Sequence, residues 1–296
     1  MALSSLAGPP LPAFLGIDPE TWKRVVNFED YGALLGLVQN SLIAAAVLGL
    51  VGGIVGVFVM QRDMAFAVHG ISELSFAGAA GALLIGANVV TGSLVGSLVA
   101  ALLIGLLGSR ARDRNSVIGV LMPFGLGLGI LFLALYEGRA SSKFGLLTGQ
   151  IVSVDSPQLG YLLTISAIAM AILLVLWRPL TFDSLDADVA AARGVPSLAV
   201  SLGFMLALGL IVAVAIQIVG ALLVMALLVT PAASALLVSA SPRVVPLLSA
   251  AFGVLAAVGG ILLALGGALP ISPYVTTIAF LTYLVCRVVG SRRQLI

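Results

Sequence analysis

Residues 64–86 read MAFAVHGISELSFAGAAGALLIG, and this stretch decides the fold. It is long enough to cross a bilayer as a helix, because the hydrocarbon core needs about 20 helical residues. Yet it carries His69, the one histidine of the chain, and Glu73. At a spacing of four residues the two side chains lie on one helix face. The stretch therefore predicts a membrane helix with an acid about 14 Å from its start.

Two interpretations of this pair remain open at this point. An ionised carboxylate near the bilayer centre costs at least about 2.5 kcal/mol, so such groups face protein, water or a passing ion. The functional interpretation is a polar point on a cation route. The alternative is a neutral His–Glu pair that holds two helices together. We favour the first, because ionisable groups inside a membrane are functional by default.

The composition places the whole chain in a membrane. Of its 296 residues, 61% are hydrophobic and only 9% are charged, whereas a soluble domain carries about 25% charged residues. The long apolar runs do not alternate as the strands of a transmembrane β-barrel do. The single cysteine, Cys286, permits neither an intrachain disulfide nor a cysteine-based metal cluster. We expect a protein that lies in the bilayer and has no nucleic-acid partner; the bacterial cytoplasmic membrane is the location that the family resemblance described below implies.

The hydropathy pattern predicts an all-α, polytopic protein with about nine transmembrane helices, with eight as the alternative. The apolar run 198–237 is about twice as long as one crossing, so it must fold as two spans with a bend at residues 217–220. In the first span, Gly49 with Gly53 and Gly52 with Gly56 form two G-x-x-x-G spacings that predict a packing face. The expected spans are 33–59, 64–86, 89–107, 117–136, 159–177, two within 198–237, 244–265 and 274–289.

Pro231 falls inside the second half of the 198–237 run. It removes one backbone donor and frees the carbonyl of Leu227. A broken helix is tolerated in a membrane only where protein or a cavity satisfies the freed groups. A pore-lining break and an ordinary kink both fit. The candidate pathway or helix-break residues are Ser72, Gln217, Thr230 and Pro231.

The chain divides into three parts, and its basic residues predict the orientation. Residues 1–32 form an N-terminal extracytoplasmic segment with an interfacial helix around Trp22, or a disordered tail. Residues 33–290 form the transmembrane domain, and 291–296 a cytoplasmic tail. The positive-inside rule places the N-terminus outside and the C-terminus inside. The predicted inner side then holds Arg62, Arg110, Arg112, Arg114, Arg178, Arg193, Arg243, Arg287, Arg292 and Arg293.

Residues 178–196 read RPLTFDSLDADVAAARGVP and predict a short cytoplasmic helix within 183–196. Asp183 or Ser184 is the expected N-cap, the alanines propagate the helix, and glycine followed by proline ends it. Such a helix either docks in a groove of a separate ATPase or is a solvated connector. The candidate coupling residues are Asp183, Asp186, Asp188, Arg193 and Gly194.

Taken together, these features resemble the membrane subunit of the ABC importers for zinc, manganese or iron. The resemblance covers most of residues 33–290. Residues 188–194 are similar to the E-A-A-x-x-x-G loop of ABC permeases, with aspartate in place of glutamate. The resemblance to the metal importers rests on three stretches. These are residues 64–84, 183–196 and, most specifically, AIQIVGALLVMALLVTPAASALL at 215–237.

One departure from the family concerns the polar pair itself. The second span of the family carries G-D-x-x-S-H-A, whereas residues 68–74 here read VHGISEL. His69 thus takes the place of the aspartate, and Glu73 that of the histidine. One imidazole nitrogen and one carboxylate oxygen still suit zinc and manganese as metal ligands, with zinc favoured by the imidazole.

The resemblance implies a permease half that binds no cofactor and carries a divalent metal ion as cargo. It implies a homodimer that brings two His69–Glu73 pairs towards one axis, a cytoplasmic ATP-binding subunit and an extracytoplasmic metal-binding protein. The chain has no G-x-x-x-x-G-K-[ST] loop, so we expect that it is not an enzyme and that ATP hydrolysis belongs to another subunit. The alternatives are an ion- or proton-coupled secondary transporter that uses Glu73 and a permease for a metal chelate.

Overall fold

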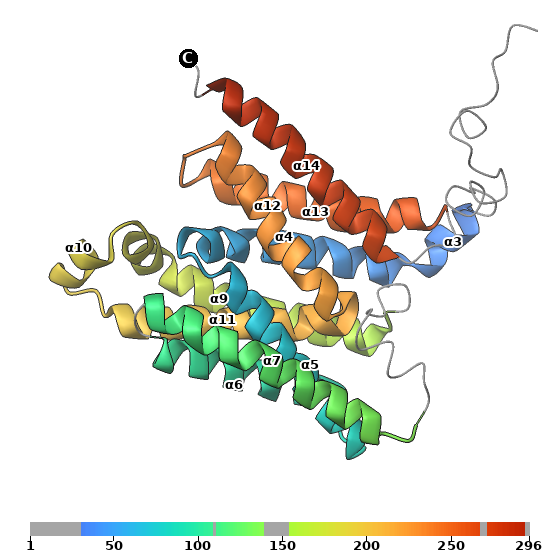
Figure 1. Ribbon diagram of the computed structural model, residues 1–296. Helices are drawn as coiled ribbons and strands as arrows, with labels where there is room; N and C mark the ends of the chain where they lie inside the picture. Colours follow the sequence, from blue (N-terminus) through green and yellow to red (C-terminus); the bar gives the residue numbers. More distant parts are fainter. Residues whose placement is uncertain (1–30, 109–110, 139–153, 267–270, 294–296) are drawn as a thin grey trace, which may run out of the picture.

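The computed structural model describes residues 31–108, 111–138, 154–266 and 271–293, and the regular elements in these ranges are all helices (Figure 1). The predicted interfacial helix around Trp22 and most of the loop 137–157 lie outside them. The helices are α3 Tyr31–Leu37, α4 Gln39–Gln61, α5 Ala65–Leu84, α6 Val89–Leu107, α7 Ala111–Leu135, α9 Ser156–Leu185, α10 Ala187–Ala192, α11 Ser197–Val219, α12 Ala221–Val238, α13 Val244–Ala264 and α14 Ile271–Arg293.

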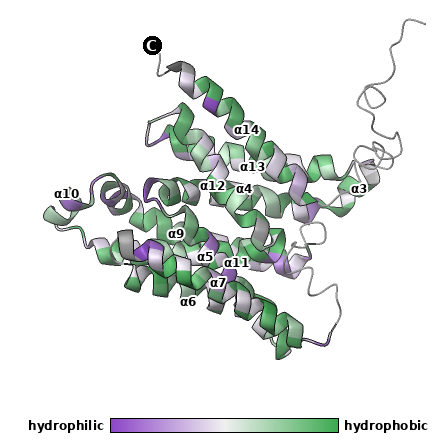
Figure 2. Cartoon of the chain, viewed as in Figure 1, coloured by the Kyte–Doolittle hydropathy of each residue, from purple (hydrophilic) through white to green (hydrophobic). Residues whose placement is uncertain are grey.

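Each predicted span corresponds to one long helix. Eight helices among the described residues are long and apolar enough to cross a membrane, and α12 is a shorter apolar helix at the ninth predicted position. The polytopic all-α prediction is therefore confirmed. Among the boundaries that differ from the prediction, the largest shifts are that α7 begins at Ala111, inside the predicted basic loop, and that α9 continues past Trp177 to Leu185. Figure 2 shows hydrophobic colouring along the long helices and hydrophilic residues at α10.

The bend in the long apolar run lies where the sequence predicts it. Gly220 separates α11 from α12 and has a φ of 79° and a ψ of 160°. Only glycine adopts this conformation without strain, because it has no Cβ. The Gly220 N–H still donates to the carbonyl of Ile216, which ends α11. One glycine thus turns a 40-residue run into two helices.

The helices form two groups that pack side by side (Figure 1). One group holds α4, α12, α13 and α14, and the other holds α5, α6, α7, α9 and α11. Contacts of α4 with α9, and of α12 with α5 and α11, join the two groups. Helix α5, which carries His69 and Glu73, therefore lies where the groups meet.

The glycine spacings of α4 set its distance from two neighbouring helices. A Cβ on Gly49 would lie 2.6 Å from the backbone of Gly253 in α13, and one on Gly53 would lie 2.6 Å from the carbonyl oxygen of Ser249. The Ser249 hydroxyl donates to the Gly53 carbonyl at 2.6 Å. Gly56, from the other spacing, faces α12 instead. The two G-x-x-x-G spacings thus serve two different helix contacts, as close backbone approach in lipid requires.

We expect Gly56→Ala to destabilise the permease. The new methyl group would collide with the carbonyl oxygen of Leu228 in α12, a backbone atom that cannot move aside alone. Overpacking of this kind costs about 1–3 kcal/mol. Gly119→Ala in α7 is the matched control, because nothing lies within 4 Å of its added Cβ. Thermal unfolding in detergent measures both; equal unfolding temperatures for the two variants would contradict the α4–α12 packing.

Candidate functional site

His69 and Glu73 form a contact within one face of α5, as their spacing predicts. Nε2 of His69 lies 3.5 Å from Oε1 of Glu73, with side-chain exposures of 30% and 9%. Nδ1 of His69 is buried and has no hydrogen-bond partner among the described residues. No group of three or more His, Cys, Asp or Glu that could hold a metal occurs in the described part of the chain. The described part of one chain therefore offers at most two candidate ligands at this point, fewer than the four that zinc normally takes.

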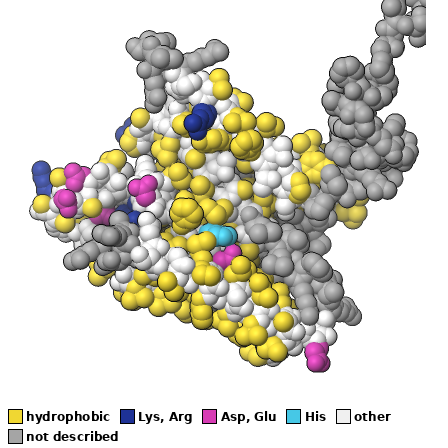
Figure 3. All heavy atoms as spheres, in the orientation of Figure 1, with side chains coloured by type: hydrophobic (Ala, Val, Ile, Leu, Met, Phe, Trp, Pro, Cys, Tyr) yellow, Lys and Arg dark blue, Asp and Glu magenta, His cyan; other side chains and the backbone are white. Residues whose placement is uncertain are grey.

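The pair lies at the surface of the single chain. Figure 3 shows the histidine with an acidic side chain beside it, surrounded by hydrophobic side chains. Helix α12 packs against α5 and leaves one stripe half-exposed along its length. The described members of this stripe are Met225, Ala226, Val229, Thr230 and Ala233. The helix that packs against α5 thus presents a half-exposed stripe that is apolar except for Thr230.

The other candidate pathway residues on α5 and α12 lie in different surroundings. Thr230 belongs to the half-exposed stripe, whereas Pro231 is buried and α12 continues through it. A Cβ on Gly52 would lie 3.6 Å from the carbonyl oxygen of Leu227, which the proline leaves free. That carbonyl thus faces α4 and not a pore. The structure therefore favours the ordinary kink over the pore-lining break for Pro231. Ser72 is fully buried, and its hydroxyl has no partner among the described residues.

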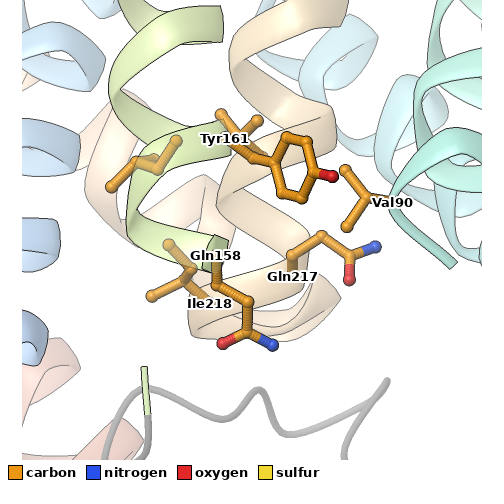
Figure 4. Close-up of a pocket in the computed structure, with 7 residues that line it drawn as sticks. Val90, Gln158, Tyr161, Gln217 and Ile218 are labelled. Carbon is orange, nitrogen blue, oxygen red and sulfur yellow. The ribbon is translucent and has the colours of Figure 1, made fainter. Parts of the chain in front are cut away.

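Gln217 lies apart from the pair. Its amide donates to the carbonyl of Val89 at 3.5 Å, near the end of α5 opposite to His69. It lines a pocket with Gln158 and Tyr161 of α9 (Figure 4). The pocket measures about 10 Å³, about the space of one water. His69 lies in the second turn of α5, so about 20 Å of helix separates it from this pocket.

The predicted cytoplasmic helix is α10, but its N-cap differs from the prediction. Oδ1 of Asp186 accepts the N–H of Val189 at 3.0 Å, so Asp186 is the cap. Asp183 and Ser184 were expected to cap the helix, and this was wrong because α9 continues through both. Asp188 is exposed in the first turn. Helix α10 projects from the end of the bundle (Figure 1).

The end of α10 matches its predicted stop signal. Arg193 is the C-cap, and Gly194 follows with a φ of 82°. The N–H of Gly194 donates to Ala191 and that of Val195 to Ala190, both at 3.0 Å. This is the Schellman arrangement, which satisfies carbonyls that a helix end leaves free. The exposed ends of α10 therefore carry Asp188 and Arg193 on a rigid, fully capped turn.

A buried ion pair at the same end was not predicted from the sequence. Nη1 of Arg62, in the turn between α4 and α5, lies 2.6 Å from Oδ2 of Asp183, with side-chain exposures of 11% and 3%. The same nitrogen is 3.4 Å from the Ser184 hydroxyl, and the guanidinium lies 5.9 Å from the Phe204 ring centre. Arg114 donates to the Arg62 carbonyl at 3.1 Å. The pair joins the start of α5 to the segment that leads into α10.

A buried hydroxyl chain also escaped the sequence analysis. Oγ of Ser75 lies 2.7 Å from Oγ of Ser93, and the Ser93 hydroxyl donates to the carbonyl of Ala213 at 3.1 Å. The three residues belong to α5, α6 and α11. Two serines among many small residues give no sequence signal for this contact. These hydrogen bonds hold α5 against α6 and α11.

Comparison with known proteins bears on these features. The Halalkalibacterium halodurans manganese transport system membrane protein MntC is 32% identical over 219 residues, 74% of this chain and 75% of that protein. The Streptococcus parasanguinis manganese import system permease protein ScaB is 30% identical over 232 residues, 78% of this chain and 82% of that protein. The solved structure of PsaBC from Streptococcus pneumoniae in complex with Fab matches with a TM-score of 0.78 at 27% identity.

That structural match covers 88% of this chain and 95% of the PsaBC chain, so the whole helical bundle is shared. The family model described as the ABC 3 transport family matches residues 35–290. The match spans all the long helices and includes α10. The chain therefore belongs to the ABC 3 transport family, as a multi-pass membrane permease.

Proposed function

We propose that this permease forms half of a pore for a divalent metal ion and that the His69–Glu73 pair contacts the ion. The observation that carries the proposal is the 3.5 Å imidazole–carboxylate contact between a partly exposed His69 and a buried Glu73. Nitrogen and oxygen ligands together suit first-row divalent metals. Two ligands from one chain bind weakly, and weak binding suits a site that must release its ion.

A homodimer would complete the site. A carboxylate that faced lipid would cost several kcal/mol, so this face requires a polar or proteinaceous cover. A second copy that packed on the α12 stripe would place two His69–Glu73 pairs near one axis. Four ligands would then surround the ion, the number that zinc normally takes. The small side chains of the stripe, Ala226 and Ala233 among them, suit close helix packing.

The basic end of the molecule indicates how the permease is oriented in the membrane. Arg62, Arg114 and α10 lie at one end of the bundle, and the positive-inside rule places that end in the cytoplasm. We propose that α10 docks there on a separate ATP-binding subunit through Asp188 and Arg193. An extracytoplasmic metal-binding protein would deliver the ion at the opposite end.

The cargo we propose to test first is manganese, because MntC and ScaB both carry manganese in their names. Zinc stays a prediction from the imidazole ligand alone, and iron is the third candidate. Uptake of radioactive manganese into proteoliposomes, with unlabelled manganese, zinc and iron compared as competitors, separates the three. The most effective competitor at equal concentration identifies the preferred metal.

The proposal predicts that metal uptake depends entirely on the ATPase. Proteoliposomes that hold the permease, the ATP-binding subunit and the metal-binding protein should accumulate manganese when ATP is enclosed. Vesicles with the permease alone and an imposed proton gradient should not, whereas a secondary transporter using Glu73 would transport under those conditions. Gradient-driven uptake by the permease alone would overturn the ABC assignment of its energy source.

A further inference from the structure

A second pocket lies at the same end of the bundle as α10, between α9 and the turn that joins α12 to α13. It measures about 420 Å³, within the usual range of small-molecule sites. None of its lining residues belongs to α5 or to the polar pair. The lining residues are Trp177, Arg178, Thr181, Phe182, Leu185, Pro242 and Arg243.

Two arginines give this pocket its charge. Arg178 and Arg243 are both exposed, and neither makes an ion pair or a hydrogen bond with any residue that the structure describes. No acidic side chain is among the lining residues that the structure describes. Asp183, which is near in sequence, is turned to Arg62 on another face of α9. The pocket thus presents two uncompensated guanidinium groups, which bind phosphate through paired N–H donors.

The membrane side of the pocket is apolar and exposed. On α9, Leu174 and Val175 are 62% and 80% exposed, one turn before Arg178. On α13, Leu247 is 72% exposed, one turn after Arg243. Both arginines therefore end an exposed hydrophobic flank that faces acyl chains in a bilayer. A ligand that follows this surface has a long apolar part and an anionic head.

We propose that this pocket binds the phosphate headgroup of an anionic phospholipid in the cytoplasmic leaflet. Trp177 lines the pocket, and tryptophans are enriched at membrane interfaces. Basic pockets between helices on the cytoplasmic side of a membrane bind anionic headgroups. A free phosphate would satisfy the guanidiniums but leave Phe182 and Leu185 in water. A phospholipid covers the charged and the apolar walls together.

The test measures lipid retention by the full-length permease in complex with its ATP-binding subunit. Nanodiscs are made from phosphatidylcholine with or without phosphatidylglycerol, and native mass spectrometry counts the lipids that stay bound. We expect Arg178→Gln and Arg243→Gln each to weaken phosphatidylglycerol retention about fivefold, and the double variant roughly thirtyfold. Arg287→Gln is the matched control, because Arg287 is exposed on α14 outside the pocket and bonds only to Tyr283.

Three results would overturn the proposal. The first is equal retention of phosphatidylglycerol by the double variant and by Arg287→Gln. The second is displacement of the lipid by inorganic phosphate at low millimolar concentration, which would assign the site to a soluble anion. The third is loss of the ATP-binding subunit from the double variant with lipid retention unchanged, which would make this surface a subunit contact.

Discussion

Replacing Glu73 with glutamine is expected to reduce metal uptake by the assembled importer about 10- to 100-fold and to leave the complex intact. Glutamine keeps the size of the side chain and one carbonyl oxygen, but it removes the negative charge that a divalent ion needs. An interaction with a charged group is worth about 1.5–3 kcal/mol, and every 1.4 kcal/mol is tenfold. Uptake of radioactive manganese into proteoliposomes measures the loss.

Glu137→Gln is the matched control for this prediction. It is the same substitution at an acid just beyond α7, and Glu137 is exposed. His69→Gln tests the imidazole separately, because glutamine keeps a hydrogen-bonding side chain at that position. If the pair only holds helices together, the Glu73 and His69 variants will transport normally and will unfold at lower temperature. Reduced uptake with an unchanged unfolding temperature supports a role of the pair in the metal pathway. Wild-type uptake by both variants would contradict that role.

The sequence predicted the features that hydropathy and glycine determine. The nine apolar segments became helices because each is long enough to satisfy its own backbone in lipid. The bend at residues 217–220 was predicted because a 40-residue apolar run must fold as two spans, and the structure places it at Gly220, which has a positive φ. The His69–Glu73 contact followed from helical spacing alone. These features depend on residues close together in the chain.

The features that the sequence did not predict depend on partners far apart in the chain. Arg62 and Asp183 are 121 positions apart, and each lies in a short polar segment that resembles an exposed loop. Because Asp183 has a buried partner, α9 extends beyond the apolar segment and the cap of α10 moves to Asp186. Hydropathy gives no information about such a pair. The same limit applies to the pocket at Arg178 and Arg243, which α9 and the distant turn between α12 and α13 build together.

The Arg62–Asp183 pair supplies the other large expected effect. Asp183→Ala should destabilise the permease by about 3–5 kcal/mol, because it leaves a buried guanidinium without its partner. Asp188→Asn is the control, since Asp188 is exposed in the neighbouring helix and exposed charges contribute little. Unfolding of the purified permease in detergent, followed by intrinsic fluorescence, compares the two. A cost for Asp183→Ala no greater than that of Asp188→Asn would show that the pair is not buried as described.

The double variant Arg62→Met with Asp183→Leu tells whether the charges themselves are needed for stability. In the described part of the structure, Nε of Arg62 and Oδ1 of Asp183 are buried without partners, so the pair only partly recovers its cost of desolvation. A hydrophobic pair of similar volume is therefore expected to restore the stability that Asp183→Ala loses. The pair joins the α4–α5 turn to the residues just before the α10 cap. If the double variant is stable but its metal uptake per ATP falls, the pair therefore couples movements of α10 to α5. If stability and uptake per ATP both return to wild-type values, the role of the pair is structural.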